Sequence, residues 1–177
     1  MSGGREPYAC EEARKPGCTR ICAGSDWRHD RAVGFSSAVN SAATNLASSG
    51  VFLSVAAGNS NANACNSSPA SATGVMTVAA SDRTDHRASF SNFGSCVEIY
   101  APGVSILSTW LNGGTNTISG TSMATPHVTG VAALYKGANG DVASSTLVTA
   151  LINLSTKNVI INNPAGTPNR LLFKSTR

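Results

Sequence analysis

Charge is scarce in this sequence. Only 12% of the 177 residues are charged, and the net charge of +4 is not concentrated in any basic run, which argues against a nucleic acid as partner. No apolar stretch reaches the ~18 residues that a membrane span requires, so we expect no membrane partner. The residues after Met1 contain no apolar h-region, so we expect no signal peptide in this chain. The abundant small residues are typical of a secreted, densely packed enzyme.

Cysteine is also sparse, and its five copies fall into two groups: Cys10, Cys18 and Cys22, and then Cys65 and Cys96. The Cys-x3-Cys spacing of the first group is only a weak match to a metal clip. No second pair of ligands accompanies it, so we expect no metal site there. A chain of this length is expected to form one domain with a hydrophobic core.

Regular patterning is missing from residues 1–33, where no helical or strand period is clear. This segment holds six of the 13 basic residues, five of the nine acidic residues and three of the five cysteines. We therefore interpret residues 1–33 as an atypical N-terminal arm and residues 34–177 as the folded domain.

Helical and strand patterns alternate from residue 34 onward. Ser36 or Ser37 can cap a first helix that ends at Gly50, and the apolar run 51–56 follows as a buried strand. The later elements that we expect are strands at 75–80, 97–100, 105–110, 117–118, 158–161 and 170–173, and helices at 122–135 and 142–153. Gly137 can cap the first of these two helices. The alternation predicts an α/β fold, a mainly parallel sheet with helices on both faces.

Two polar side chains stand where a sheet of this kind presents its active groups. Ser122 lies in Gly120-Thr121-Ser122-Met123-Ala124-Thr125-Pro126-His127-Val128, a glycine turn before an apolar helix. A serine at a helix start has free backbone N–H groups beside it, and these favour an oxyanion. Asn59 ends Ala56-Ala57-Gly58-Asn59, just past a strand's carboxyl end, where ligands of open α/β sheets bind. Its amide can donate to the same oxyanion.

The nine residues 120–128 resemble the active-site serine motif of the subtilisin-like serine proteases, nearest the proteinase K and aqualysin branch. The resemblance continues almost unbroken from Gly34 to Phe173. It implies a serine endopeptidase that hydrolyses peptide bonds through an acyl-enzyme on Ser122, with Asn59 in the oxyanion hole. It also implies a subtilisin-like fold, here the C-terminal part and incomplete on the N-terminal side. Peptide or protein substrates, an extracellular location, a monomer and chemistry without a cofactor follow from the same resemblance.

The resemblance further implies a substrate pocket and a disulfide. The family's pocket walls match Ala56-Ala57-Gly58 and Ser68-Pro69-Ala70. All of these side chains are small, which suggests a roomy S1 pocket that tolerates apolar groups and has broad specificity. Cys65 and Cys96 match a disulfide of the aqualysin-like proteases in spacing and context, and such a bond implies an oxidising compartment.

A structural Ca²⁺ is the one metal that the resemblance suggests. The matching ligands are the carboxylate of Glu98 and the backbone carbonyls of Thr73 and Val75, and oxygen ligands are what Ca²⁺ prefers. Glu98 is longer than the family's carboxylate, and Thr73 stands where the family has proline. A plain edge-strand charge remains the alternative interpretation of Glu98.

The base half of the catalytic triad is absent from this sequence. A serine hydroxyl needs a base to take its proton, and the family supplies it from Asp-Thr-Gly and His-Gly-Thr-His motifs that precede the serine. Neither motif occurs here. His127 is turned away from Ser122 on the same helix, His86 lies in a polar loop and His29 lies in a charge cluster of the arm, so we expect none to be the base. The chain alone is therefore predicted to be weakly active or inactive.

Other interpretations remain open. A non-catalytic protease remnant or peptide-binding module fits the missing base. An α/β-hydrolase esterase fits poorly, because Ala124 stands where its Gly-x-Ser-x-Gly elbow has glycine. A shifted reading frame, a mispredicted start or a divergent arm would each explain residues 1–33. Because a sheet without its first strands has an open edge, we expect the isolated chain to be marginally stable or prone to aggregation.

Overall fold

A seven-stranded sheet runs through the described part of the chain, which the computed structural model gives as residues 8–11, 21–24 and 34–174. Its strands are β1 (Tyr8–Glu11), β2 (Ile21–Gly24), β3 (Phe52–Ala56), β4 (Met76–Ser81), β5 (Ile99–Pro102), β8 (Thr156–Lys157) and β9 (Arg170–Leu171). The spatial order is β1-β2-β3-β4-β5-β9-β8, with parallel pairing from β2 to β9 and antiparallel pairing of β1 and β8 at the two edges.

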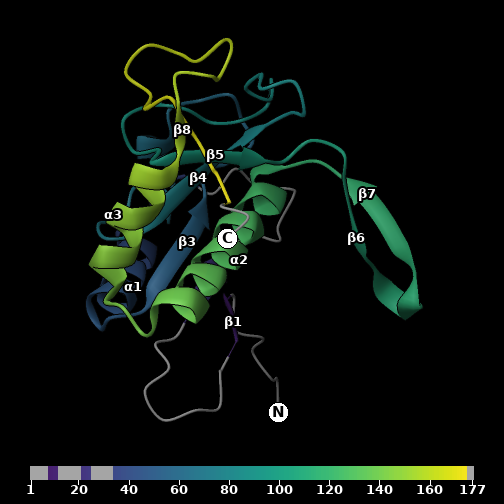
Figure 1. Ribbon diagram of the computed structural model, residues 1–177. Coiled ribbons are helices and arrows are strands. Elements are labelled where there is room, and N and C mark those ends of the chain that lie inside the picture. Colours follow the sequence, from purple (N-terminus) through teal and green to yellow (C-terminus); the bar gives the residue numbers. More distant parts are fainter. Residues whose placement is uncertain (1–7, 12–20, 25–33, 175–177) are drawn as a thin grey trace, which may run out of the picture.

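Three α-helices pack on this sheet, α1 (Ser37–Ser48), α2 (Thr121–Asn139) and α3 (Ser144–Leu154). Figure 1 shows α2 and α3 on one face and α1 behind the sheet. The predicted α/β class, with a mainly parallel sheet and helices on both faces, is confirmed. None of the helices in the described residues is long and apolar enough to cross a membrane.

Alternation along the buried strands divides the core between the two faces. Phe52 of β3 joins a cluster with α2 and α3, whereas its neighbour Leu53 packs with Ala43 of α1. On α2 the buried residues Ala124, Val128 and Ala132 recur every four positions, so they form one stripe against the sheet. Because alanine is small, the helix can lie close over β3 and β4, and this fixes where its N-terminus meets the strand ends.

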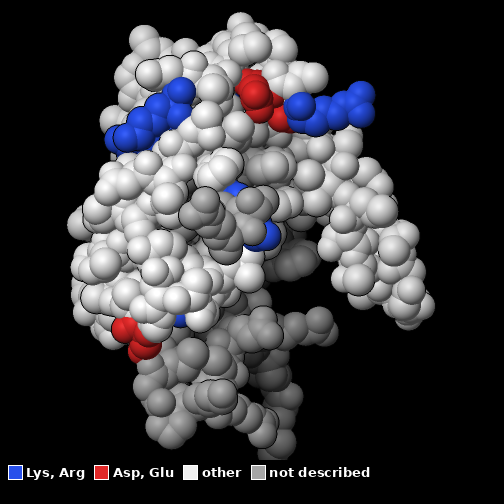
Figure 2. All heavy atoms as spheres, in the orientation of Figure 1, with Lys and Arg blue, Asp and Glu red and all other residues white. Residues whose placement is uncertain are grey.

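A β-hairpin, β6 (Ile106–Thr109) and β7 (Thr115–Ile118), projects away from the sheet (Figure 1). The two strands were expected at 105–110 and 117–118, and the turn between them lies in a short 3₁₀ segment at Leu111–Gly113. Leu107 and Leu111 are 67% and 77% exposed. In Figure 2 the whole projection is free of charged side chains, because the sequence from 99 to 135 has no Asp, Glu, Lys or Arg.

Several element boundaries differ from the sequence prediction. Helix α2 passes through Gly137 and ends at Asn139, with Gly140 as its C-cap at a φ of 81°. The extra turn is held by Lys136, which is 9% exposed and donates to Asp141 Oδ1 at 2.9 Å. Residues 158–161 are not a strand, because Asn158 has a φ of 62° and leaves the extended conformation.

The segment before residue 34 was wrongly expected to lack strands. Two of its stretches are β1 and β2, and β2 pairs in parallel with β3 from Ile21↔Phe52 to Gly24↔Val55. Strand β3 is therefore not an open edge in the described residues. Four-residue strands carry too little pattern to be detected without their partner, and β2 is placed by pairing with the strongly apolar β3.

Burial on α3 gives a direct test of the core. Leu147 is 0% exposed inside the cluster under α2, whereas Leu154 of the same helix is 44% exposed. We expect Leu147→Ala to lower the free energy of unfolding by about 2–5 kcal/mol, because it removes buried contacts and leaves a cavity. The matched Leu154→Ala should change it by less than about 1 kcal/mol. Urea unfolding followed by circular dichroism measures both, and equal losses would contradict this packing.

Candidate active site

Ser122 lies in the first turn of α2 and is half-buried. The turn before it is held to the sheet, because Gly120 N donates to Gly103 O at 2.8 Å. Glycine is required at 103, since a Cβ there would stand 2.6 Å from Ala80 Cβ and 2.8 Å from Gly120 O. This close approach sets the helix start directly beyond the end of β5. In this turn the N–H of Thr121 is bonded to Asn59 Oδ1, and those of Met123 and Ala124 to Gly120 O. The N–H of Ser122 is left without a partner among the described residues.

Asn59 lies beside this helix start, at the carboxyl end of β3. Its Oδ1 accepts two hydrogen bonds from Thr121, one from the backbone N at 2.8 Å and one from Oγ1 at 2.9 Å. With the oxygen held in this way, the amide nitrogen faces Gly120, where a Cβ would stand 3.6 Å from Nδ2. Asn59 is exposed, so its N–H groups are accessible to a ligand next to Ser122.

Thr121 connects the two predicted functional residues, and sequence reasoning missed it. Its side chain is fully buried, and Oγ1 also accepts from Gly58 N at 3.2 Å. One hydroxyl therefore joins the loop after β3 to the first turn of α2. The sequence did place Thr121 inside the serine motif, between Gly120 and Ser122. Its hydrogen bonds to Asn59 join residues 62 positions apart, so they could not be predicted from the neighbouring sequence.

Neither of the two histidines in the described residues is hydrogen-bonded to the serine hydroxyl. His127 Nδ1 is 2.8 Å from Met123 O in its own helix, and His86 Nδ1 is 3.0 Å from Thr84 Oγ1 in a loop. His29 lies outside the described residues. Within the described part of the chain, the Ser122 hydroxyl has no hydrogen-bond partner.

The two segments expected to wall the substrate pocket meet in the structure. Ala57 and Ala70 are buried in one cluster, and Ala56, Gly58 and Pro69 are half-buried beside them in sequence. Ser68 is used differently, because its hydroxyl accepts from Ser36 N at 2.9 Å and donates to Ser36 O at 3.1 Å. It therefore anchors the start of α1.

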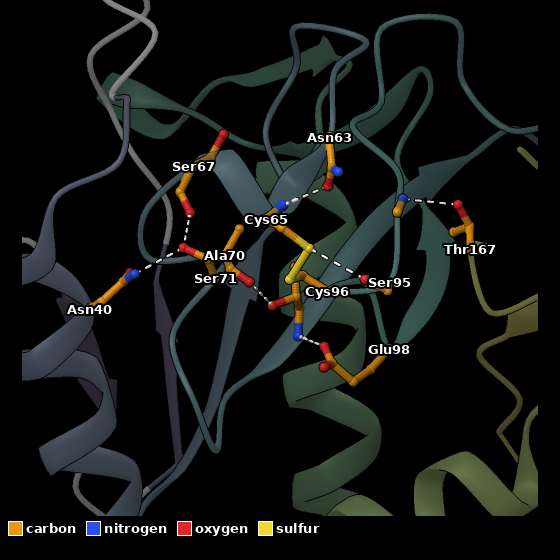
Figure 3. Close-up of a disulfide and its surroundings, with 12 residues drawn as sticks. Asn40, Asn63, Cys65, Ser67, Ala70, Ser71, Ser95, Cys96, Glu98 and Thr167 are labelled. Atoms are coloured by element: carbon orange, nitrogen blue, oxygen red, sulfur yellow. Dashed lines mark hydrogen bonds between the residues drawn. A yellow bond between two sulfur atoms is a disulfide. The ribbon is translucent and has the colours of Figure 1, made fainter. Parts of the chain in front are cut away.

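The predicted disulfide is confirmed. Cys65 and Cys96 are bonded, with their Cα atoms 5.3 Å apart, and they join the 3₁₀ turn Ala64–Asn66 to the segment before β5 (Figure 3). Asn63 Oδ1 accepts from Cys65 N at 2.9 Å and holds the turn. The disulfide lies near Ala70, because Cys96 packs against the buried cluster that contains this residue.

Glu98 is placed close to the segment that would supply the other calcium ligands. Its Oε2 accepts from Thr77 N, two residues after Val75 (Figure 3). Burial raises the pKa of Glu98 to about 7, while the Thr77 hydrogen bonds and the positive charge of Arg170 act in the opposite direction. The described residues contain no cluster of three or more His, Cys, Asp or Glu side chains that could hold a metal. A cation here would therefore depend on backbone carbonyls.

The fold and this site together define a class of protein. A serine at a helix start, next to an amide donor at the carboxyl edge of a parallel sheet, is an arrangement that can attack a carbonyl and stabilise the resulting oxyanion. Residues 19–171 match the Subtilase family, peptidase S8, and the chain belongs to this family. The match begins ahead of residue 34, and the division of the chain at that residue stays a prediction.

Named relatives agree with this assignment. The chain is 48% identical over 166 residues to the subtilisin-like serine protease AsES of Sarocladium strictum. The aligned region covers 94% of this chain and 42% of the relative. It is 55% identical over 140 residues to the alkaline serine protease ver112 of Corniculantispora psalliotae, covering 79% and 36%. A solved cold adapted subtilisin-like serine proteinase superposes with a TM-score of 0.79 at 43% identity, covering 88% of this chain and 55% of that one. The chain thus spans less than half the length of these curated relatives.

The raised pKa of Glu98 predicts a pH dependence of stability. The unfolded chain ionises Glu98 near 4.5, whereas the folded chain does so near 7, so the folded state binds more protons between these values. Stability of the wild type relative to Glu98→Gln should therefore fall as pH rises from about 4.5 through about 7. Urea unfolding of both proteins at pH 5 and pH 8, with EDTA present, measures this difference.

Asp82→Asn provides the control for this measurement. Backbone hydrogen bonds from His86 and Thr84 lower the pKa of Asp82, so its titration lies below the window. A pH response of Asp82→Asn equal to that of Glu98→Gln would show that the effect does not come from Glu98.

Proposed function

We propose that this chain carries the nucleophile and oxyanion part of a serine endopeptidase. Ser122 Oγ attacks the carbonyl carbon of a peptide bond, and a general base takes the hydroxyl proton and gives it to the amine that leaves as the C–N bond breaks. Water then hydrolyses the acyl-enzyme, which releases the acid and restores the serine hydroxyl. The observation that carries the proposal is the paired anchoring of Asn59 Oδ1 by Thr121, which leaves the amide nitrogen beside Ser122. Asn59 Nδ2 and the backbone N–H of Ser122 would stabilise the oxyanion in the tetrahedral intermediate.

The general base is the part that the described residues do not supply. No histidine of the described chain reaches Ser122, which supports the hypothesis that this chain alone hydrolyses peptides weakly or not at all. The acid and base motifs of the family would have to come from another segment or from a partner chain. An oxyanion site without its base can still give about 10³–10⁴-fold acceleration over water.

Peptides or proteins are the proposed substrates. Small residues at 56–58 and 68–70 support an S1 pocket that admits large apolar side chains. The disulfide supports an oxidising, extracellular location, and a relative from Thermus is named an extracellular serine proteinase. We propose a monomer that needs no cofactor for the chemical step.

Hydrolysis of a set of fluorogenic peptides with apolar and charged P1 residues tests the proposal. We expect the purified chain to show at most slow release, at or below the residual acceleration of about 10⁴-fold over water. Ser122→Ala should reduce whatever acyl-enzyme turnover remains, whereas Ser145→Ala, an exposed serine on α3, should not. Rapid turnover that Ser122→Ala abolishes would refute the predicted weakness of the isolated chain and confirm the nucleophile.

A non-catalytic peptide-binding module is the second candidate. It is favoured by one observation, the lack of a hydrogen-bond partner for the Ser122 hydroxyl among the described residues. Peptide binding that is measured by fluorescence anisotropy and is unchanged in Ser122→Ala, with no cleavage by this chain or by a longer chain that includes the acid and base motifs, would favour this function over the enzyme.

A structural Ca²⁺ is proposed near Glu98. A carboxylate and the nearby carbonyls of Thr73 and Val75 are oxygen donors of the kind that this ion binds. The raised pKa of Glu98 supports a place where a cation would stabilise the ionised carboxylate, although Arg170 already contributes positive charge. The ion would tie the loop before β4 to β5 and would take no part in the reaction.

Calcium addition should raise the melting temperature of the wild type more than that of Glu98→Gln. Binding to the folded state alone contributes about 2.7 kcal/mol when the free ion is at 100 times its Kd. Differential scanning fluorimetry at pH 8 measures the shift, and Mg²⁺ serves as the control ion because it demands stricter geometry. Equal calcium shifts in the two proteins would exclude Glu98 as a ligand.

A further inference from the structure

Asn92 is a buried polar residue in the segment that joins β4 to β5. Its side chain is 2% exposed and makes three hydrogen bonds to one loop. Oδ1 accepts from Ser60 N and from Ala62 N, each at 3.0 Å, and Nδ2 donates to Ala57 O at 2.8 Å. Its backbone N donates to Gly58 O at 2.9 Å.

These four bonds bracket Asn59 in the sequence. Two of them hold Ala57 and Gly58 before it, and the other two hold Ser60 and Ala62 after it. No other side chain in the described part of the chain bonds the loop on both sides of Asn59. Thr121 fixes the amide oxygen of Asn59 from α2, so the backbone and the side chain of this residue are held by separate groups.

The contact between Asn92 and the loop leaves no spare space. Gly58 has a φ of 102°, and a Cβ at this position would stand 2.4 Å from Asn92 Nδ2. The loop can therefore approach the amide only because residue 58 is glycine. The Asn92 side chain therefore fixes the path of the backbone after β3 through hydrogen bonds and close contact.

We propose that Asn92 is a positioning residue for the oxyanion donor Asn59. It acts through the backbone of residues 57–62 and sets where Asn59 Nδ2 stands relative to Ser122. The proposal deepens the proposed function and rests on it for the chemical meaning of Asn59. Its physical basis is that an oxyanion donor must be pre-organised, because a displacement of about 1 Å can cost about 10²-fold in rate.

Asn169 offers a matched control within the same chain. Its side-chain amide also bonds a loop backbone in both directions, accepting from Ile160 N and donating to Ile160 O, each at 2.9 Å. That loop contacts the β8–β9 side of the sheet and makes no hydrogen bond to Asn59. Replacing either asparagine with alanine therefore leaves backbone groups unpaired, but only Asn92 bonds the loop that carries Asn59.

The first experiment follows the Asn59 side-chain amide in a ¹H–¹⁵N spectrum of the 177-residue chain. The resonance pair is assigned by its loss in Asn59→Ala. We expect Asn92→Ala to shift or broaden this pair, and Asn169→Ala to leave it unchanged. Asn92→Asp keeps the acceptor for Ser60 N and Ala62 N but replaces the donor to Ala57 O with an oxygen. It provides a second variant, which should also shift the pair if the alanine variant does not fold.

An unchanged Asn59 pair in both folded Asn92 variants would overturn the proposal. Equal changes in Asn92→Ala and Asn169→Ala would overturn it as well, because they would reflect a general loss of stability. This readout needs no catalysis, so it decides the role of Asn92 even if peptide hydrolysis is never observed.

The second experiment applies to any assembly or longer chain that shows Ser122-dependent hydrolysis. We expect Asn92→Ala to lower kcat per titrated active site by about 10²-fold with KM little changed. A merely structural residue would lower the number of active sites and leave kcat per site unchanged. That result would contradict the proposal, whereas failure of Ser122→Ala to affect hydrolysis would contradict the proposed function instead.

Discussion

The hydrogen bonds between Asn59 and Thr121 are the interaction on which the site depends. They link the loop after β3 to the first turn of α2, two elements that meet only because the α2 stripe packs over the sheet. Both groups are neutral, and Thr121 is fully buried, so the link is short-range, directional and little affected by salt. Two hydrogen bonds to one oxygen restrict the orientation of the Asn59 amide, and an oxyanion donor requires such pre-organisation.

Close backbone approaches make this arrangement possible. Gly103 lets the turn before Ser122 touch the end of β5, and Gly58 lets the loop of Asn59 lie against the amide of Asn92. Polar side chains are buried near these contacts, and those of Ser91, Asn92 and Thr121 bond backbone groups there. Charged side chains are few on the face shown in Figure 2, and the projecting hairpin carries none.

Long apolar elements were predictable, and short or strongly context-dependent ones were not. The strands near residues 52 and 76 and the helix that begins at Ser37 agree closely with their patterns, since each alternates or repeats strongly enough to identify itself. Strand β2 and the last turn of α2 were missed, because one depends on pairing with β3 and the other on the Lys136–Asp141 contact. The strand predicted at 158–161 was wrong, because Asn158 adopts a left-handed backbone conformation in the folded turn.

The sequence by itself determined the family and the disulfide partners, because each lies in a contiguous motif or matches a family spacing. From the same motifs it proposes Ser122 as the nucleophile and Asn59 as the oxyanion donor. It also determined what is missing, the acid and base motifs of the triad. Only the tertiary structure decided how Asn59 is aimed, because its anchors Thr121 and Asn92 lie 62 and about 30 positions away. Hydrogen bonds of that range depend on the packing of α2 and the β4–β5 segment against the strand ends, and no local pattern encodes them.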